Sequence, residues 1–129
     1  MKPPSPIKIY LVEDNFAYSY VLEETMNEHG NFKVITSSTG EECLDRLNTD
    51  NPDVIILDYN LDKGMNGLDV LRQIRIKKPK IPVIVLSSQP DVQVAADLLK
   101  EGAFDYIQKK SNDKAMEKLQ GSILKALHL

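Results

Sequence analysis

The sequence predicts an α/β fold, in which five strands alternate with five helices and pair into one parallel sheet. Short apolar runs of strand length recur along the chain, and each is followed by apolar residues at helical spacing. Three of these runs, over 7–12, 54–57 and 82–86, are nearly continuous. Continuous apolar strands are typical of sheets that carry helices on both faces, so a doubly wound sheet is expected.

The first two strands flank a helix. They are predicted over 7–12 and 32–37, after a short polar lead-in at 1–6. Gly30 is expected to end the helix as its C-terminal cap. The helical spacing is carried by Tyr18, Val21, Leu22, Thr25, Met26 and His29.

The second helix begins with a capping signal. Ser38 and Thr39 are each followed three residues later by a glutamate, which is the pattern of a capping box. The apolar face of this helix consists of Cys43, Leu44 and Leu47. Pro52 ends the segment, and the third strand is predicted over 54–57.

Two further helices flank the fourth strand, which is predicted over 82–86. The apolar spacing of the helix before it is carried by Leu68, Val70, Leu71 and Ile74. Pro79 ends that helix. The helix after the strand is predicted over 91–101, and Gly102 stops it.

The chain closes with a fifth strand over 104–108 and a helix that Ser111 is expected to cap. This helix carries Ala115, Leu119, Ile123 and Leu127. No internal repeat and no linker divides the chain, so residues 1–129 are expected to form a single domain. No segment is left for a separate output domain, which suits either a stand-alone module or the front of a longer protein.

The composition excludes several classes of function. A formal net charge of -3 argues against direct nucleic-acid binding, which needs a basic surface. No apolar run reaches the length of a membrane span, so no membrane contact is expected. One cysteine, Cys43, cannot form an internal disulfide. These features together favour the cytoplasm.

Acidic residues stand where two of the predicted strands end. Glu13 and Asp14 come directly after the first strand, and Asp58 follows the third. Ligands of open parallel sheets bind beyond the carboxyl ends of the strands. If the first and third strands are neighbours, the three carboxylates converge, which is unfavourable unless a proton or a cation joins them. Mg²⁺ with its oxygen ligands suits such a cluster.

Hydroxyl and ammonium groups stand where the last two strands end. Ser87 and Ser88 follow the fourth strand, and Lys109 and Lys110 follow the fifth. These groups suit an added anion such as a phosphoryl group. An aspartate in this setting can act as a nucleophile and form an aspartyl-phosphate. We therefore expect Asp58 to accept a phosphoryl group beside a metal ion.

Four motifs in order along the chain resemble those of the receiver domain of two-component response regulators. They are YLVEDN, VIILDYNL followed by MNGLDVL, VIVLSS, and GAFDYIQK. The resemblance runs from residue 7 to the final helix. It implies a flavodoxin-like (βα)5 fold with strand order 2-1-3-4-5, and a signalling switch rather than an enzyme. It also implies Mg²⁺-dependent phosphoryl transfer to an aspartate from the phosphohistidine of a sensor histidine kinase or a phosphotransfer protein.

The resemblance assigns the acidic positions. Asp58 matches the phosphoacceptor, which is also a metal ligand. Glu13 and Asp14 match the acidic pair that holds Mg²⁺, Asp14 more directly. Asn60 matches the position whose backbone carbonyl binds the metal.

The resemblance also assigns the residues that respond to the phosphoryl group. Ser87 matches the switch hydroxyl that hydrogen-bonds this group, and Lys109 matches the lysine that pairs with it. Tyr106 matches the switch aromatic residue, which turns inward when Ser87 moves. A downstream protein is then expected to bind the surface formed by the fourth helix, the fifth strand and the fifth helix.

The chain departs from the family pattern at two places. Asp62 stands where the family usually has proline, and the loop before Gly67 is one residue longer. Lys110 stands where the family has a proline that supplies a cis peptide bond. A cis bond costs about 2.5–4 kcal/mol without proline, so we predict a trans Lys109–Lys110 bond. The long Lys109 side chain is still expected to reach Asp58.

Two other functions fit parts of the pattern. A flavodoxin-like cofactor module shares the strand order, although the carboxylates of EDNF after the first strand would repel a flavin phosphate. An aspartate-nucleophile phosphatase is the other alternative. Many such enzymes carry a second aspartate two residues after the first, where this chain has Asn60.

Overall fold

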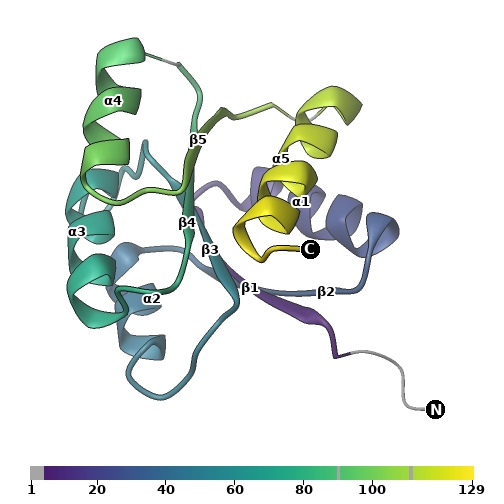
Figure 1. The fold of residues 1–129 in the computed structure, drawn as a ribbon, viewed down its shortest axis with the longest axis horizontal. Coiled ribbons are helices and arrows are strands. Elements are labelled where there is room, and N and C mark those ends of the chain that lie inside the picture. The colour runs from purple at the N-terminus through teal and green to yellow at the C-terminus, as the bar shows by residue number, and fades with distance from the viewer. Residues whose placement is uncertain (1–4, 90, 111) are drawn as a thin grey trace.

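The computed structural model describes residues 5–89, 91–110 and 112–129, and five strands alternate with five helices in this part of the chain. The elements are β1 (Ile7–Val12), α1 (Phe16–His29), β2 (Phe32–Ser37), α2 (Gly40–Arg46), β3 (Val54–Asp58), α3 (Gly67–Lys77), β4 (Val83–Ser87), α4 (Val92–Lys100), β5 (Asp105–Gln108) and α5 (Asp113–Ala126). The strands form one parallel sheet in the order β2-β1-β3-β4-β5 (Figure 1). The predicted fold class and strand order are confirmed.

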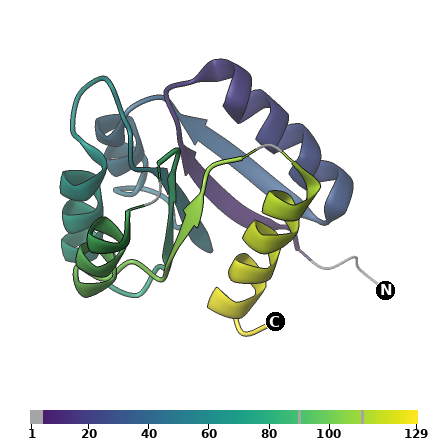
Figure 2. The ribbon, with the colours of Figure 1, turned by 90° about the horizontal axis from the view of Figure 1, so that it is seen from above.

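Helices cover both faces of the sheet. Helices α1 and α5 lie on one face, and α2, α3 and α4 lie on the other (Figures 1 and 2). Each side has its own hydrophobic core, because side chains alternate along a strand. In β1, for example, Tyr10 and Val12 pack with α2 and α3, whereas Ile9 and Leu11 pack with α1 and α5. This two-sided burial explains why the central strands read as continuous apolar runs.

The strand register brings the ends of the central strands together. Val12 of β1 pairs with Leu57 of β3, so the residues that follow them leave the sheet side by side. Asp58 then pairs with Leu86 of β4, and Ser87 pairs with Gln108 of β5. The carboxyl ends of four strands therefore meet at one edge of the sheet.

Most predicted helix boundaries are confirmed. Thr39 caps the N-terminus of α2, and its side chain accepts a hydrogen bond from the backbone N–H of Glu42. Gly30 is the C-cap of α1. The predicted cap of the last helix is wrong: Asn112 caps α5 by accepting from the backbone N–H of Ala115, whereas Ser111 lies outside the described residues. No described helix has the length and apolar character needed to cross a membrane.

Candidate functional site

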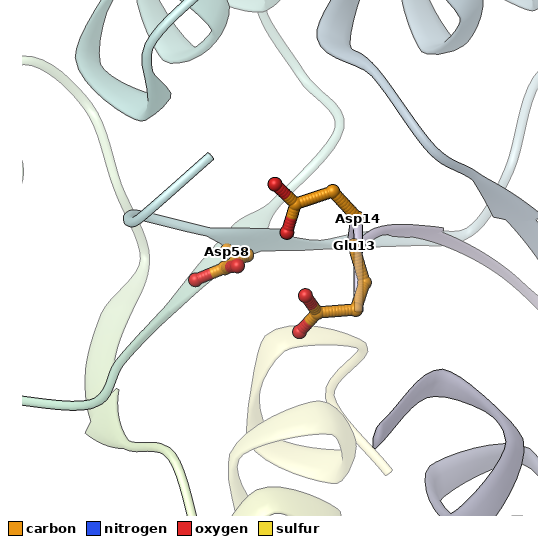
Figure 3. Close-up of side chains that lie close together, drawn as sticks. All are labelled: Glu13, Asp14 and Asp58. Atoms are coloured by element: carbon orange, nitrogen blue, oxygen red, sulfur yellow. The ribbon is translucent and has the colours of Figure 1, made fainter. Parts of the chain in front are cut away.

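Three carboxylates converge at the carboxyl edge of the sheet (Figure 3). Glu13 and Asp14 directly follow β1, and Asp58 is the last residue of β3. One oxygen from each carboxylate lies within 4.8 Å of the others. Glu13 and Asp58 are buried, whereas Asp14 is half-buried. The sequence predicted this cluster, and the pairing of β1 with β3 produces it.

Lys109 enters the cluster from the end of β5. Its Nζ lies 2.5 Å from Glu13 Oε1 and 3.3 Å from Asp58 Oδ2. Its backbone N–H donates to the carbonyl of Ser87 at 2.7 Å, which anchors the segment to β4. No described peptide bond is cis, so the predicted trans bond between Lys109 and Lys110 is confirmed. The side chain reaches Asp58 from this trans backbone, also as predicted.

The electrostatics of the cluster favour an added cation. Burial above all, together with nearby Asp58, raises the pKa of Glu13 to about 7, against the opposing effects of Lys109 and of the Asn15 N–H. Burial by itself would lower the pKa of Lys109, but Glu13 and Asp58 outweigh that effect and raise it. Three carboxylates face one ammonium group, so negative charge is in excess. The donors are all oxygens, which fits Mg²⁺, and Glu13, Asp14 and Asp58 could hold it.

Backbone N–H groups hold each carboxylate in place. The N–H of Asn15 donates to Glu13 Oε2 at 3.0 Å, and the N–H of Asn60 donates to Asp58 Oδ1 at 3.0 Å. The N–H of Asp62 donates to Asp14 Oδ2 at 2.8 Å. A proline at position 62 could not make this last bond, because proline has no N–H. The departure from the family pattern therefore adds a contact to a candidate metal ligand.

Ser87 and Asn60 lie together beside the cluster. The Ser87 side chain is buried, and its Oγ donates to the carbonyl of Gln89 at 3.2 Å and to Asn60 Oδ1 at 3.5 Å. Ser88 donates to the same Asn60 oxygen through its N–H at 3.3 Å and its hydroxyl at 3.2 Å. The amide side chain of Asn60 thus ties the loop after β3 to the loop after β4. The family resemblance implied a role only for the backbone carbonyl of Asn60.

Tyr106 lies apart from the carboxylates. It stands on β5, opposite Val85 of β4, and it is half-buried. With Asp91, Val92 and Ala95 it lines a hollow at the start of α4. Its buried hydroxyl has no hydrogen-bond partner among the described residues.

Two further residues contribute contacts that were not predicted from the sequence. The ring of Tyr18 lies 4.5 Å from Lys109 Nζ, and Glu41 Oε1 accepts from the N–H of Met65 in the loop after β3 at 2.9 Å. Tyr18 was assigned only to the apolar face of its helix. It is the third residue of the helix that directly follows Glu13 and Asp14, and this closeness to the acidic pair is a signal that could have found it.

The fold and the site together define a class: flavodoxin-like α/β domains with an acidic pocket and a lysine at the carboxyl edge of the sheet. Residues 9–120 match the family model described as the response regulator receiver domain. The chain therefore belongs to the response regulator receiver domain family. Members of this family are signalling modules of two-component systems rather than enzymes.

Curated and solved relatives agree with this membership. The DNA-binding transcriptional regulator NtrC of Klebsiella pneumoniae is 36% identical over 100 residues, which are 78% of this chain and 21% of NtrC. The chain thus spans about a fifth of that relative. The response regulator domain of Thermotoga maritima CheB superposes with a TM-score of 0.84 at 26% identity, and covers 96% of this chain and 98% of that one. A receiver domain protein of Clostridium thermocellum has a TM-score of 0.78 at 30% identity, with 94% of both chains covered.

Proposed function

We propose that this chain is a phosphorylation-dependent switch in which Asp58 accepts a phosphoryl group. The donor is the phosphohistidine of a sensor histidine kinase or of a phosphotransfer protein, and the transfer needs Mg²⁺. The observation that carries the proposal is the buried Asp58 carboxylate, which lies beside two further carboxylates and 3.3 Å from Lys109. A buried acid with both a cation site and a fixed ammonium group has the parts that phosphoryl transfer requires.

In the transfer, an oxygen of Asp58 forms a bond to phosphorus while the bond between phosphorus and the donor nitrogen breaks. The electron pair of that bond stays on the imidazole, which takes up a proton. Lys109 neutralises charge on the phosphoryl oxygens, and the hydroxyl of Ser87 donates a hydrogen bond to one of them. Glu13, Asp14, Asp58 and the backbone carbonyl of Asn60 would hold Mg²⁺, which would supply further positive charge there when bound.

The same residues connect phosphorylation at Asp58 to a change at the protein surface. Ser87 has to leave Asn60 and Gln89 to reach the phosphoryl group, which frees the loop after β4. We propose that Tyr106 then turns further inward, because no hydrogen bond from the described residues holds its hydroxyl in the present position. The α4–β5–α5 surface responds, and a downstream protein binds it. Exposed apolar side chains on and beside α4, Val92, Leu99 and Phe104, suit such a contact.

We further propose that residues 1–129 act as one receiver domain in the cytoplasm. It signals through proteins and makes no direct contact with nucleic acid or membrane. The acidic cluster weighs against the alternative of a flavin module, because three carboxylates would repel the cofactor phosphate. The acidic cluster does not weigh against the phosphatase alternative. A turnover assay with a generic phosphate ester tests that alternative.

The test is phosphorylation by a small acyl phosphate in Mg²⁺, followed by intact mass. The wild-type chain is expected to gain one phosphoryl group, and Asp58→Ala to gain none. Asp45→Ala is a matched control, since Asp45 is an exposed aspartate on α2, outside the cluster. Labelling of Asp58→Ala at the wild-type rate would remove Asp58 from this role.

A further inference from the structure

The ring of Tyr18 lies against the ammonium group of Lys109. The distance from Nζ to the ring centroid is 4.5 Å, and Tyr18 stands in the first turn of α1, four residues after Asp14. An ammonium group within about 6 Å of an aromatic face is attracted by the negative charge of that face. The ammonium group of Lys109 thus has three partners among the described residues: Glu13, Asp58 and the Tyr18 ring.

The ring differs from the two carboxylates because it carries no charge. A cation in the site would attract the carboxylates of Glu13 and Asp58, and a phosphoryl group on Asp58 would replace the oxygen that Lys109 now faces. Both ion pairs therefore change during the reaction. The ring is unaffected, because the Tyr18 hydroxyl stays neutral. Burial is the main reason that the pKa of this hydroxyl is raised, and the charges of Glu13 and Asp58 raise it in the same direction. A lysine side chain has many rotamers, so a contact that persists can decide where its ammonium group points.

We propose that Tyr18 is a positioning residue, whose ring holds the Lys109 ammonium group beside Asp58 throughout phosphoryl transfer. The inference rests on the proposed roles of Asp58 and Lys109. It assigns the effect to the aromatic face of Tyr18 and not to its hydroxyl. Aromatic replacements should therefore preserve the effect, and apolar replacements of similar size should not.

The kinetic test compares Tyr18→Leu with Tyr18→Phe and Tyr18→Trp. The rate of Asp58 phosphorylation by a small acyl phosphate in Mg²⁺ is measured for each variant. We expect Tyr18→Leu to be about three- to tenfold slower, which is the size of one cation–π contact. Tyr18→Phe should stay within about twofold of wild type, and Tyr18→Trp should be at least as fast, because indole binds cations best. Tyr18→Met serves as the non-aromatic variant if Tyr18→Leu does not fold.

The spectroscopic test needs no phosphorylation and no metal. Lysine is labelled with ¹³C at the ε carbon, and the Lys109 signal is assigned by its loss in Lys109→Gln. The ring current should shift the Lys109 ε protons upfield in the wild type, in Tyr18→Phe and in Tyr18→Trp, and the shift should disappear in Tyr18→Leu. An unshifted wild-type signal, or equal rates for Tyr18→Leu and Tyr18→Phe, would overturn the inference. If wild-type Asp58 is not phosphorylated, the proposed function fails, whereas the shift still decides whether the contact exists.

Discussion

At the scale of the single residue, the contribution of Glu13 to the free energy of unfolding depends on pH. Its carboxyl group is buried between Lys109 and Asp58, and burial raises its pKa from 4.5 to about 7. Between these two pH values the folded protein binds a proton that the unfolded chain has released. The free energy of unfolding therefore falls as pH rises through this interval.

The first prediction follows from this linkage. In metal-free protein, Glu13→Gln should remove the part of the decline that lies between pH 4.5 and about 7, because the amide does not titrate. Urea unfolding of wild type and variant at several pH values, with chelator present, measures the difference. Parallel curves for the two proteins across this interval would contradict the raised pKa.

The second prediction concerns Asp14, the half-buried member of the cluster. Asp14→Asn removes one negative charge and one strong oxygen ligand from the candidate metal site. Mg²⁺ affinity should fall by at least about tenfold, while the metal-free protein keeps its fold. Calorimetric titration with Mg²⁺ measures the change, and an unaltered dissociation constant would exclude Asp14 as a ligand.

The positions of some site residues could be predicted from the sequence, whereas several of their side-chain contacts could not. Glu13, Asp58 and Lys109 were predicted because each stands where a strand ends, and parallel strands bring such ends together. The contacts of Tyr18 with Lys109 and of the Asn60 side chain with Ser88 were not predicted. They depend on side-chain directions across separate elements, which no local pattern specifies.

At the scale of the element, the loop between β3 and α3 is held by carboxylates outside it. Asp14 accepts from the N–H of Asp62, and Glu41 of α2 accepts from the N–H of Met65. Gly64 lies between these anchors with a φ of 71°, and a Cβ there would press against the Glu41 carboxylate. Hydrogen bonds to Asp14 and Glu41 therefore hold the longer loop after Asp58 in place.

The third prediction tests the backbone conformation of this loop at Gly64. Gly64→Ala should lower the free energy of unfolding by about 1–2 kcal/mol, because a residue with a Cβ is disfavoured at positive φ. The matched control is Gly121→Ala in α5, where a Cβ would meet nothing within 4 Å. That change should instead add about 0.5–1 kcal/mol, since alanine favours a helix over glycine. Urea unfolding measures the change in the free energy of unfolding for both variants. Equal changes of the same sign would contradict strain at Gly64.

The fourth prediction separates the backbone of Asp62 from its side chain. Asp62→Pro removes the N–H that donates to Asp14, whereas Asp62→Ala keeps it. We expect Mg²⁺ affinity to fall by about tenfold in the proline variant, as when an outer partner of a metal ligand is lost. The alanine variant should stay closer to wild type in the same titration. A larger loss in the alanine variant would assign the effect to the carboxylate.

Element boundaries were predicted where a local signal sets them. The caps at Thr39 and Gly30 depend on residues next to the helix end, and the sequence contains that information. The cap of α5 was placed one residue early, because Ser111 and Asn112 are both good N-caps and adjacent. The choice between them depends on where β5 and α5 pack, which is a property of the assembled fold.

At the scale of the whole molecule, β3 and β4 are the most enclosed of the described strands, because every residue of each is buried and each has a parallel partner on both sides. The fifth prediction is that the backbone amides of these two strands exchange hydrogen most slowly, near the rate set by global unfolding. Amides of α4 should exchange faster, since Leu98 is its one buried residue. Exchange measured by NMR or mass spectrometry tests this order, and faster exchange in β3 than in α4 would contradict it.

The two separate cores also determine how such a chain can diversify over generations. Because the sheet lies between them, we expect a side chain that changes size beneath α1 and α5 to have little effect on the packing beneath α2, α3 and α4. Lineages can therefore accumulate changes on one side without compensating changes on the other. Pairs of substitutions such as Leu22→Ala with Leu71→Ala should have additive costs, whereas neighbours within one core should not. Inherited variation in this chain is expected to fall into two nearly independent sets, one for each core.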